Sequence, residues 1–308
     1  MNRQIAWPCL LAAALGLAVP ARATPEAGPA QTVLFVGNSF TFGALSPVRA
    51  YRPELVTDLN GEGIGGVPAL VAMFAKDAGL PWRISLETAP GEDLQFHYDK
   101  RRARLAGRWD VVILQGYSTL SKAHPGDPSE HVAAAVRLAA MVKRENPAAR
   151  IDLVTTWSRA DQTYRPGGHW YGKPITAMAG DIAAANALAI RTDAEIEGAI
   201  PVGQAWNRAM DEGVADPNPY DGVAFGQLNL WTTDQYHASA YGYYLEALVI
   251  FGTVSGRDPR TLGAAEQAGF ELGFSPDIVA TIERVAAEEL LASGRIPAKV
   301  IKADRAAP

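Results

Sequence analysis

Cysteine is almost absent from this chain of 308 residues, which contains a single one, Cys9. Cys9 lies in an N-terminal segment that we expect to be removed, so the mature chain would contain none. Without cysteine the mature protein can form no disulfide, and it has no thiol for nucleophilic catalysis.

Long apolar runs are also missing, with one exception at the N-terminus. Arg3 is followed by an apolar run rich in Leu and Ala over residues 5–20, and Ala21-Arg22-Ala23 then has the small residues of a cleavage site. This order is typical of a secretory signal peptide, and we predict cleavage after Ala23 and export to the periplasm or the medium. A membrane anchor is the alternative, but the run is short for a span. We therefore expect no stable membrane insertion after cleavage.

Runs of basic residues are absent as well. The chain has 28 Lys and Arg residues and 33 Asp and Glu residues. Two arginines and no acidic residue lie in segment 1–23, so the mature chain carries a net charge of −7 with histidine neutral. A mildly acidic surface without basic runs argues against nucleic acid or an anionic membrane as a partner.

Spacings typical of metal sites are missing too. The sequence has no His-Glu-x-x-His and no pair of cysteines. Four of its histidines show no ligand spacing to one another, namely His97, His124, His131 and His169. We expect neither a metal nor an organic cofactor, and we interpret these histidines as surface or structural residues.

Short apolar segments alternate with helical patterns along the rest of the chain. Strands are predicted at 32–36, 83–88, 110–114, 151–156 and 200–202. Helices are predicted at 67–78, 93–105, 129–145, 175–190, 204–211, 239–251 and 275–292, and segment 47–63 is predicted to be a loop. Strands that alternate with helices form βαβ units, in which a parallel sheet is covered on both faces. We predict one α/β domain over residues 24–308, with five strands that are mostly parallel.

The first predicted strand ends abruptly in Gly37-Asn38-Ser39. In open α/β sheets, ligands bind just beyond the carboxyl ends of the strands. Ser39 is therefore placed where a nucleophile would be useful. The alternative is that Asn38 and Ser39 only begin a loop or cap a helix.

A second candidate group, Asp234-Gln235-Tyr236-His237, lies near the C-terminus. A serine hydroxyl is a poor nucleophile until a base removes its proton, and histidine is the base suited to neutral pH. A carboxylate three residues before that histidine can reach its Nδ1–H and stabilise the imidazolium. Gly91, after the second predicted strand, would let a backbone N–H approach a developing oxyanion. Together with Ser39, these residues indicate a Ser-His-Asp hydrolase.

In this order the blocks resemble those of the SGNH (GDSL-like) hydrolases. That family has Gly-Asp-Ser after strand one, a lone glycine after strand two and Asp-x-x-His before the last helices. Here these are Gly37-Asn38-Ser39-Phe40-Thr41, Gly91 and Asp234-Gln235-Tyr236-His237. The resemblance covers residues 32–252 and implies a flavodoxin-like three-layer α/β/α fold and hydrolysis of acyl esters. It makes Ser39 the nucleophile, His237 the base and Asp234 its orienting residue, with the N–H groups of Ser39 and Gly91 in the oxyanion hole.

One block departs from the family pattern. The third block is usually Gly-x-Asn-Asp, whose asparagine donates to the oxyanion, but here the third predicted strand is followed by Gln115-Gly116-Tyr117-Ser118. A subgroup with Gly-Asn-Ser-Phe-Thr and Leu-Gln-x-x-Ser looks similar, and there Gln115 would be the substitute donor. A glutamine that only bonds neighbouring backbone is the alternative.

Several side chains near the strand ends are candidates for substrate binding: Asn38, Tyr117, Trp157, His169 and Trp231. Aromatic side chains in loops could stack on sugar rings, or they could anchor their own loops. We predict an exported serine esterase acting on acyl esters, foremost acetyl esters, of a small molecule, a carbohydrate or a cell-envelope glycan. The alternatives are a non-catalytic glycan-binding relative and a metal-dependent phosphoesterase built on Asp234 and His237.

Overall fold

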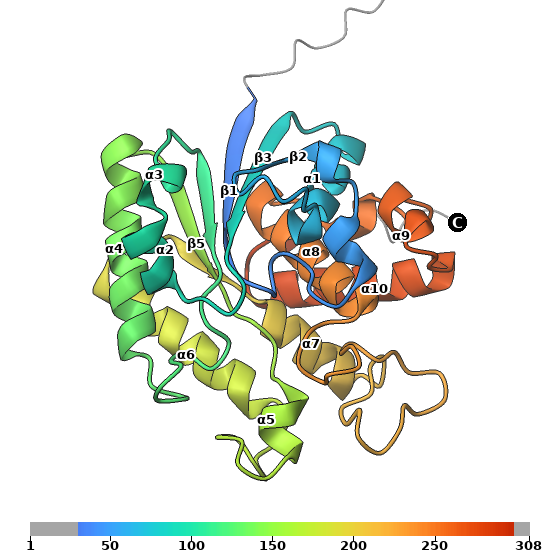
Figure 1. Cartoon of the computed structure of the whole chain (residues 1–308). Helices are drawn as coiled ribbons and strands as arrows, with labels where there is room; N and C mark the ends of the chain where they lie inside the picture. The colour runs from blue at the N-terminus through green and yellow to red at the C-terminus, as the bar shows by residue number, and fades with distance from the viewer. Residues whose placement is uncertain (1–29, 299–308) are drawn as a thin grey trace, which may run out of the picture.

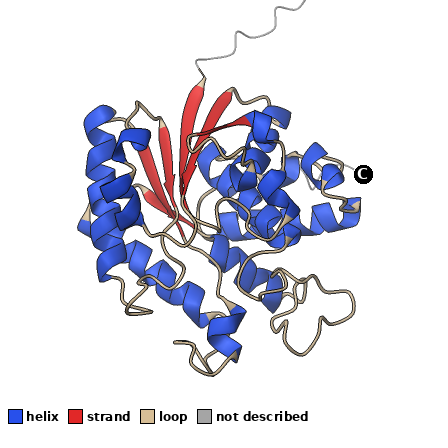
Figure 2. Ribbon diagram, viewed as in Figure 1, coloured by secondary structure: helices blue, strands red, loops and turns tan. Residues whose placement is uncertain are grey.

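The structure, a computed structural model, describes residues 30–298. At its centre is a sheet of six strands, all parallel, in the order β2-β3-β1-β4-β5-β6 (Figure 1, Figure 2). The strands are β1 (Gln31–Gly37), β2 (Val56–Asp58), β3 (Trp82–Thr88), β4 (Val111–Leu114), β5 (Arg150–Val154) and β6 (Gly198–Ile200). The predicted α/β class is confirmed. The signal peptide predicted at 1–23 lies outside the described residues.

The strand count differs from the prediction because of β2. This strand lies inside segment 47–63, which the sequence indicated to be a loop. It has three residues, stands at the edge of the sheet and pairs only with β3. An edge strand buries little side-chain surface, so Val56-Thr57-Asp58 carries no apolar run that would mark it. The sheet therefore has six strands instead of five.

Helices cover both faces of the sheet (Figure 1). One face carries α1 (Gly66–Asp77), α7 (Val202–Asp211), α8 (Ala240–Ser255) and α10 (Pro276–Ala292). The other carries α2 (Leu94–Lys100), α3 (Arg102–Leu105), α4 (Ser129–Glu145) and α6 (Ala177–Thr192). A hydrophobic core lies on each face of the sheet. Because successive strand residues point to opposite faces, Phe35 lies in the core beneath the first set of helices and Leu34 in the core beneath the second set. The layers are α/β/α.

Short elements fill the connections and were not predicted. They are the 3-10 helices η1 (Pro47–Ala50), η2 (Pro53–Leu55) and η3 (Pro259–Thr261), and the helices α5 (Ala160–Tyr164) and α9 (Gln267–Glu271). Each is five residues or shorter, too short for a helical pattern to stand out from a loop. No helix within residues 30–298 is long and apolar enough to cross a bilayer.

The strand order determines where a ligand would bind. Without edge strand β2, the order is β3-β1-β4-β5-β6, the doubly wound order of flavodoxin-like folds. The chain moves outward from β1 first to one side and then to the other, so the ends of β1 and β4 flank the switch point. This edge lies opposite the start of β1, near the middle of the view in Figure 1.

Candidate active site

The turn after β1 is held by hydrogen bonds from Asn38. Its side-chain amide donates to the carbonyl oxygens of Glu92, at 2.9 Å, and Gly116, at 3.4 Å. Its Oδ1 accepts from the N–H of Phe40 at 3.2 Å. Asn38 thus connects the end of β1 to the loops after β3 and β4. An aspartate at this position could not donate to two carbonyls.

Gln115 supports the same turn from the end of β4. Its Oε1 accepts from the backbone N–H of Asn38 at 2.8 Å and from the hydroxyl of Thr41 at 3.0 Å. Since a backbone N–H can only donate, the amide orientation is fixed, and Nε2 donates to the carbonyl of Gly116. A Cβ on Gly37 would overlap the Thr41 hydroxyl. Both ends of the Gln115 amide are thus used within the protein, and its contact with an oxyanion stays a prediction.

The loop before α8 places Asp234 against His237. Backbone hydrogen bonds from Thr232 N–H to His237 O, at 2.8 Å, and from Ser239 N–H to Leu230 O, at 2.7 Å, close the loop. Gln235 at its tip has φ +57°, in the left-handed region that is unfavourable for a residue with a side chain. The loop is therefore held in a strained turn by its closing bonds.

Asp234 binds both the ring and the backbone of the histidine. His237 Nδ1 donates to Asp234 Oδ2 at 2.6 Å, and the N–H groups of Tyr236 and His237 donate to Oδ1 at 3.0 and 2.9 Å. Burial alone would raise the pKa of Asp234, but these hydrogen bonds outweigh it and lower the pKa below its usual value. The carboxylate is thus ionised at neutral pH and fixes the Nδ1–H tautomer. His237 Nε2, which has no partner among the described residues, is left as the basic nitrogen.

The turn that carries Ser39 and the loop that carries His237 lie next to each other in the structure. The rings of Phe40 and His237 lie 5.7 Å apart between centroids. Tyr243 of α8 donates its hydroxyl to the carbonyl oxygens of Ser39, at 3.2 Å, and Ala44, at 3.3 Å. Ser39 is 6% exposed. No hydrogen bond joins the two described side chains Ser39 and His237 directly, and such bonds often tighten only when substrate binds.

Three residues that the sequence reasoning assigned no role form a cluster, and one of them, Tyr236, interacts with the Ser39 hydroxyl. The guanidinium of Arg159 stacks 3.6 Å from the ring centroid of Tyr236 and donates to the Ser118 hydroxyl at 3.3 Å. Burial raises the pKa of Tyr236, whereas Arg159 and hydrogen bonding with the hydroxyls of Ser39 and Ser118 lower it. Tyr236 occupies a variable position of Asp-x-x-His, so only its place in that block could have indicated it.

Gly91 lies in a turn after β3. The N–H of Ala89 donates to Gly37 O at 3.0 Å, and the N–H of Glu92 donates to Ala89 O at 3.2 Å. Gly91 has φ +66°, and nothing lies within 4 Å of where a Cβ would be. Glycine is thus favoured here by the backbone conformation and not by space. Among the described hydrogen bonds, the N–H groups of Gly91 and Ser39 have no acceptor.

Two of the predicted substrate contacts need correction. Trp157 is fully buried between Phe40 and Trp206, at ring distances of 4.1 and 4.7 Å. Trp231 is 1% exposed and donates its ring N–H to Ser158 O at 3.0 Å. Neither ring offers a surface to a substrate, because both are core residues, and their ring N–H groups donate to the carbonyl oxygens of Tyr236 and Ser158. The sequence could not separate these aromatics from exposed ones in the same segments.

Of the other predicted binding residues, Asn38 is also buried, whereas Tyr117 and His169 are more accessible. Tyr117 is half-buried in the loop after β4, and Lys122 lies 5.5 Å from its ring centroid. His169 is exposed and packs on Trp170, with 4.6 Å between ring centroids.

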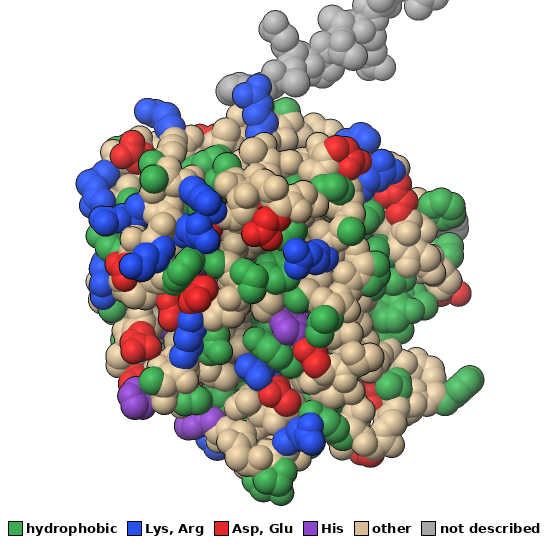
Figure 3. All heavy atoms as spheres, viewed as in Figure 1, with side chains coloured by type: hydrophobic (Ala, Val, Ile, Leu, Met, Phe, Trp, Pro, Cys, Tyr) green, Lys and Arg blue, Asp and Glu red, His purple; other side chains and the backbone are tan. Residues whose placement is uncertain are grey.

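Positive and negative side chains are interspersed over the face in Figure 3. Within residues 30–298, no three or more His, Cys, Asp or Glu side chains are grouped to hold a metal ion.

The fold is similar to that of solved proteins with little sequence identity. A DUF4886 family protein from Bacteroides uniformis is similar at a TM-score of 0.59 and 17% identity, over 87% of this chain and 97% of that one. A protein assigned as a GDSL-like lipase, from Parabacteroides merdae, is similar at a TM-score of 0.51 and 16% identity, over 75% and 98%. The chain therefore shares its fold with these two proteins. No protein-family model and no curated protein matches it.

Proposed function

We propose that this protein is a serine esterase of the SGNH type, with Ser39 as nucleophile, His237 as base and Asp234 as its orienting residue. One observation carries the proposal: an ionised Asp234 holds His237 Nδ1 at 2.6 Å and leaves Nε2 unpartnered among the described residues, on a loop that meets the Ser39 turn. This is the arrangement by which a histidine activates a serine hydroxyl. The fold shared with a protein assigned as a GDSL-like lipase supports the assignment.

In the proposed reaction His237 Nε2 takes the proton of Ser39 Oγ as the oxygen attacks the acyl carbon. The tetrahedral intermediate collapses, and the imidazolium gives that proton to the leaving alcohol. Water then attacks the acyl-enzyme, with His237 again as base, and releases the acid and free Ser39. No cofactor enters this proposal.

The oxyanion would be held by the backbone N–H groups of Ser39 and Gly91, which have no acceptor among the described hydrogen bonds. Two side chains are candidates for a third donor. Gln115, the predicted one, could contribute only if Nε2 left the carbonyl of Gly116. The Tyr236 hydroxyl needs no such change, since it already interacts with the Ser39 hydroxyl.

The proposed substrate is an acyl ester, foremost an acetyl ester, on a small molecule, carbohydrate or envelope glycan. The proposal of an exported enzyme rests on the signal peptide predicted from residues 1–23. Asn38 is assigned a positioning role, because both hydrogens of its amide are donated to backbone carbonyls.

The proposed function is tested by hydrolysis of p-nitrophenyl acetate by residues 24–308, for the wild type and Ser39→Ala, with and without EDTA. We expect activity that resists the chelator and is lost in the variant, together with labelling of Ser39 by a fluorophosphonate. Equal rates in both proteins would exclude Ser39 as nucleophile. Loss of wild-type activity in EDTA would favour the metal-dependent phosphoesterase. Absence of hydrolysis and labelling would favour a glycan-binding relative.

A further inference from the structure

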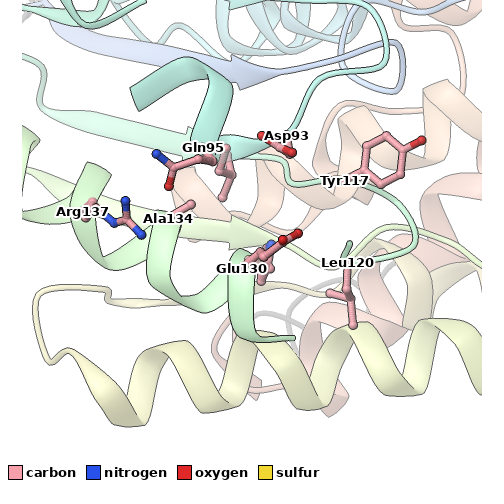
Figure 4. A pocket seen from close by; sticks show the side chains of 9 residues that line it. Asp93, Gln95, Tyr117, Leu120, Glu130, Ala134 and Arg137 are labelled. Atoms are coloured by element: carbon pink, nitrogen blue, oxygen red, sulfur yellow. The ribbon is translucent and has the colours of Figure 1, made fainter. Parts of the chain in front are cut away.

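A cavity of about 320 Å³ lies between the start of α2 and the N-terminal half of α4, and we refer to it as the α2–α4 pocket (Figure 4). Asp93 and Gln95 line it from the start of α2, Glu130 and Arg137 from α4, and Tyr117 from the loop after β4. Figure 4 shows Tyr117 and Asp93 at one end and Arg137 at the other.

Asn38 relates the pocket to the nucleophile. Its side-chain amide donates to the carbonyls of Glu92 and Gly116, and the next residue in each loop, Asp93 or Tyr117, lines the pocket. Asn38 is also the residue before Ser39. In each of these two loops, the residue that follows the carbonyl bound by Asn38 therefore belongs to the wall of the pocket.

Tyr117 connects the pocket to the candidate site through the chain. The next residue, Ser118, accepts a hydrogen bond from Arg159 at 3.3 Å, and the guanidinium of Arg159 stacks on the ring of Tyr236. A substrate bound at Ser39 could therefore extend past Tyr117 into the pocket. In an ester, the group that extends from the acyl carbon is the acyl chain or the alcohol.

The lining is suited to hydroxyl groups and not to a hydrocarbon chain. The side chains of Gln95 and Glu130 have no partner among the described hydrogen bonds and ion pairs, and Asp93 uses only Oδ1, which accepts from Phe96 N–H at 2.8 Å. Arg137 donates only its Nε, to Ala133 O at 3.3 Å. Covering these groups with an apolar chain would leave them desolvated and unpaired, at a cost in binding free energy.

The lining also disfavours an anionic ligand, because it carries two carboxylates and only one guanidinium. Carboxylates accept from hydroxyl groups, and guanidinium donates to them. The Tyr117 ring, with Leu120 and Ala134, adds apolar surface that suits the C–H face of a sugar ring. The volume is at the lower end of small-molecule sites, about 300–1,000 Å³, and so suits a single ring.

We infer that the α2–α4 pocket binds the alcohol part of the substrate, a neutral sugar ring whose hydroxyl groups bond to Asp93, Glu130 and Arg137. The inference rests on the proposed esterase function and assigns its substrate class. The acyl group would lie at Ser39 and Gly91, and the sugar would lie beyond Tyr117.

The test compares two acetyl esters in the full chain. One is p-nitrophenyl acetate, and the other is a mono-O-acetylated methyl glycoside with its remaining hydroxyls free. We expect Glu130→Gln and Arg137→Met each to lower the ratio of kcat/KM for the glycoside to kcat/KM for p-nitrophenyl acetate by about 10-fold. Glu130→Gln replaces a charged acceptor with a weaker neutral one, and Arg137→Met removes a charged donor. The exposed Glu145→Gln, at the far end of α4, is the matched control and should leave the ratio unchanged.

The deacetylated glycoside provides a second readout. It should inhibit p-nitrophenyl acetate hydrolysis competitively in the wild type and more weakly in both variants. An unchanged ratio in both variants would overturn the inference, and so would a wild type that hydrolyses only p-nitrophenyl acetate, while the proposed function would stand. A wild type that hydrolyses neither ester, with Ser39→Ala no different, would overturn both.

Discussion

Two groups of buried polar side chains in this protein are satisfied very differently. At the end of β1, the side-chain polar atoms of Asn38, Thr41 and Gln115 all have hydrogen-bond partners. In the helical layer of α8 and α10, Glu246 Oε2 and Glu283 Oε1 have no partner among the described residues. Burial raises the pKa of Glu246 well above its usual value and that of Glu283 to about 8.

Substitutions in the two groups should therefore have different effects, on activity in one group and on stability in the other. The strand-end group holds the turn that carries Ser39, the proposed nucleophile, so changes there should be seen in activity first. The carboxyl groups of the helical layer contact no proposed catalytic residue, so changes there should be seen in stability alone. The following predictions test this division, beginning with the largest effect.

Asp234→Asn should lower kcat by about 10⁴-fold, because an amide no longer fixes the Nδ1–H tautomer or stabilises the imidazolium. The thermal midpoint should change little, since Asp234 is partly exposed and its backbone contacts can be kept by the amide oxygen. Kinetics with p-nitrophenyl acetate and a thermal melt of the same preparation check both. Activity near that of the wild type would remove Asp234 from the mechanism.

Tyr236→Phe should lower kcat by about 10²-fold with KM little changed, as expected for loss of one oxyanion donor. The phenyl ring keeps its contact with the tilted ring of His237, at 4.0 Å between centroids, and its stacking with the guanidinium of Arg159. Tyr117→Phe is the comparison, since it removes a phenol from the neighbouring loop. Equal kcat in wild type and Tyr236→Phe would leave Gln115 as the candidate donor.

Asn38→Asp should affect both activity and stability. The carboxylate would face the carbonyls of Glu92 and Gly116, with the loss of both donated hydrogen bonds. We expect a loss of about 1–3 kcal/mol in the free energy of unfolding and a fall in kcat/KM of about 10- to 100-fold from displacement of the turn. Denaturant unfolding and ester kinetics measure the two effects. A variant as stable and as active as the wild type would show that the two hydrogen bonds donated by Asn38 are not needed.

Glu283→Gln should change stability only, and in a pH-dependent way. The folded pKa of Glu283, about 8, lies above its ordinary value, so the folded state holds a proton that the unfolded state has lost. Stability from this group therefore falls as the pH rises from about 4.5 to about 8. The amide of the variant cannot ionise, so above pH 8 the variant should be the more stable, by at most roughly 5 kcal/mol.

Thermal melts of the wild type and Glu283→Gln at pH 5, 7 and 9 measure the pH effect, with the exposed Glu195→Gln as a control that should follow the wild type. Melting curves of wild type and Glu283→Gln that remain parallel across this range would contradict the assignment. Esterase activity at pH 7 should be unchanged in the variant, because Glu283 contacts no proposed catalytic residue.

Much of this arrangement was predictable from sequence. Strands buried on both faces are continuous apolar runs, so β1 and β4 were recognised within one residue at each end. The Asp234–His237 contact followed from spacing within a single turn. By contrast, edge strand β2 has no apolar run, and the Arg159–Ser118 contact joins residues 41 positions apart. No local pattern encodes a contact over that separation.

The side-chain roles were harder to predict than the block positions. Gln115 was recognised as important, but the direction of its amide depends on Asn38 and Thr41, which lie 77 and 74 residues away in the chain. Trp157 and Trp231 were recognised as near the site, but their burial depends on packing against Phe40 and other core rings. Position along the chain was informative, whereas the environment of each side chain required the fold.

The fit between Gly37 and the Gln115 amide has an evolutionary consequence. A side chain at 37 would overlap Thr41, the Thr41 hydroxyl bonds to Gln115, and Gln115 bonds to the backbone of Asn38. The residues at 37, 41 and 115 can therefore be altered safely only together, so they should be inherited as a unit. Among distant relatives, loss of the glutamine should coincide with replacement of the threonine, and that joint signature would trace this lineage better than the serine alone.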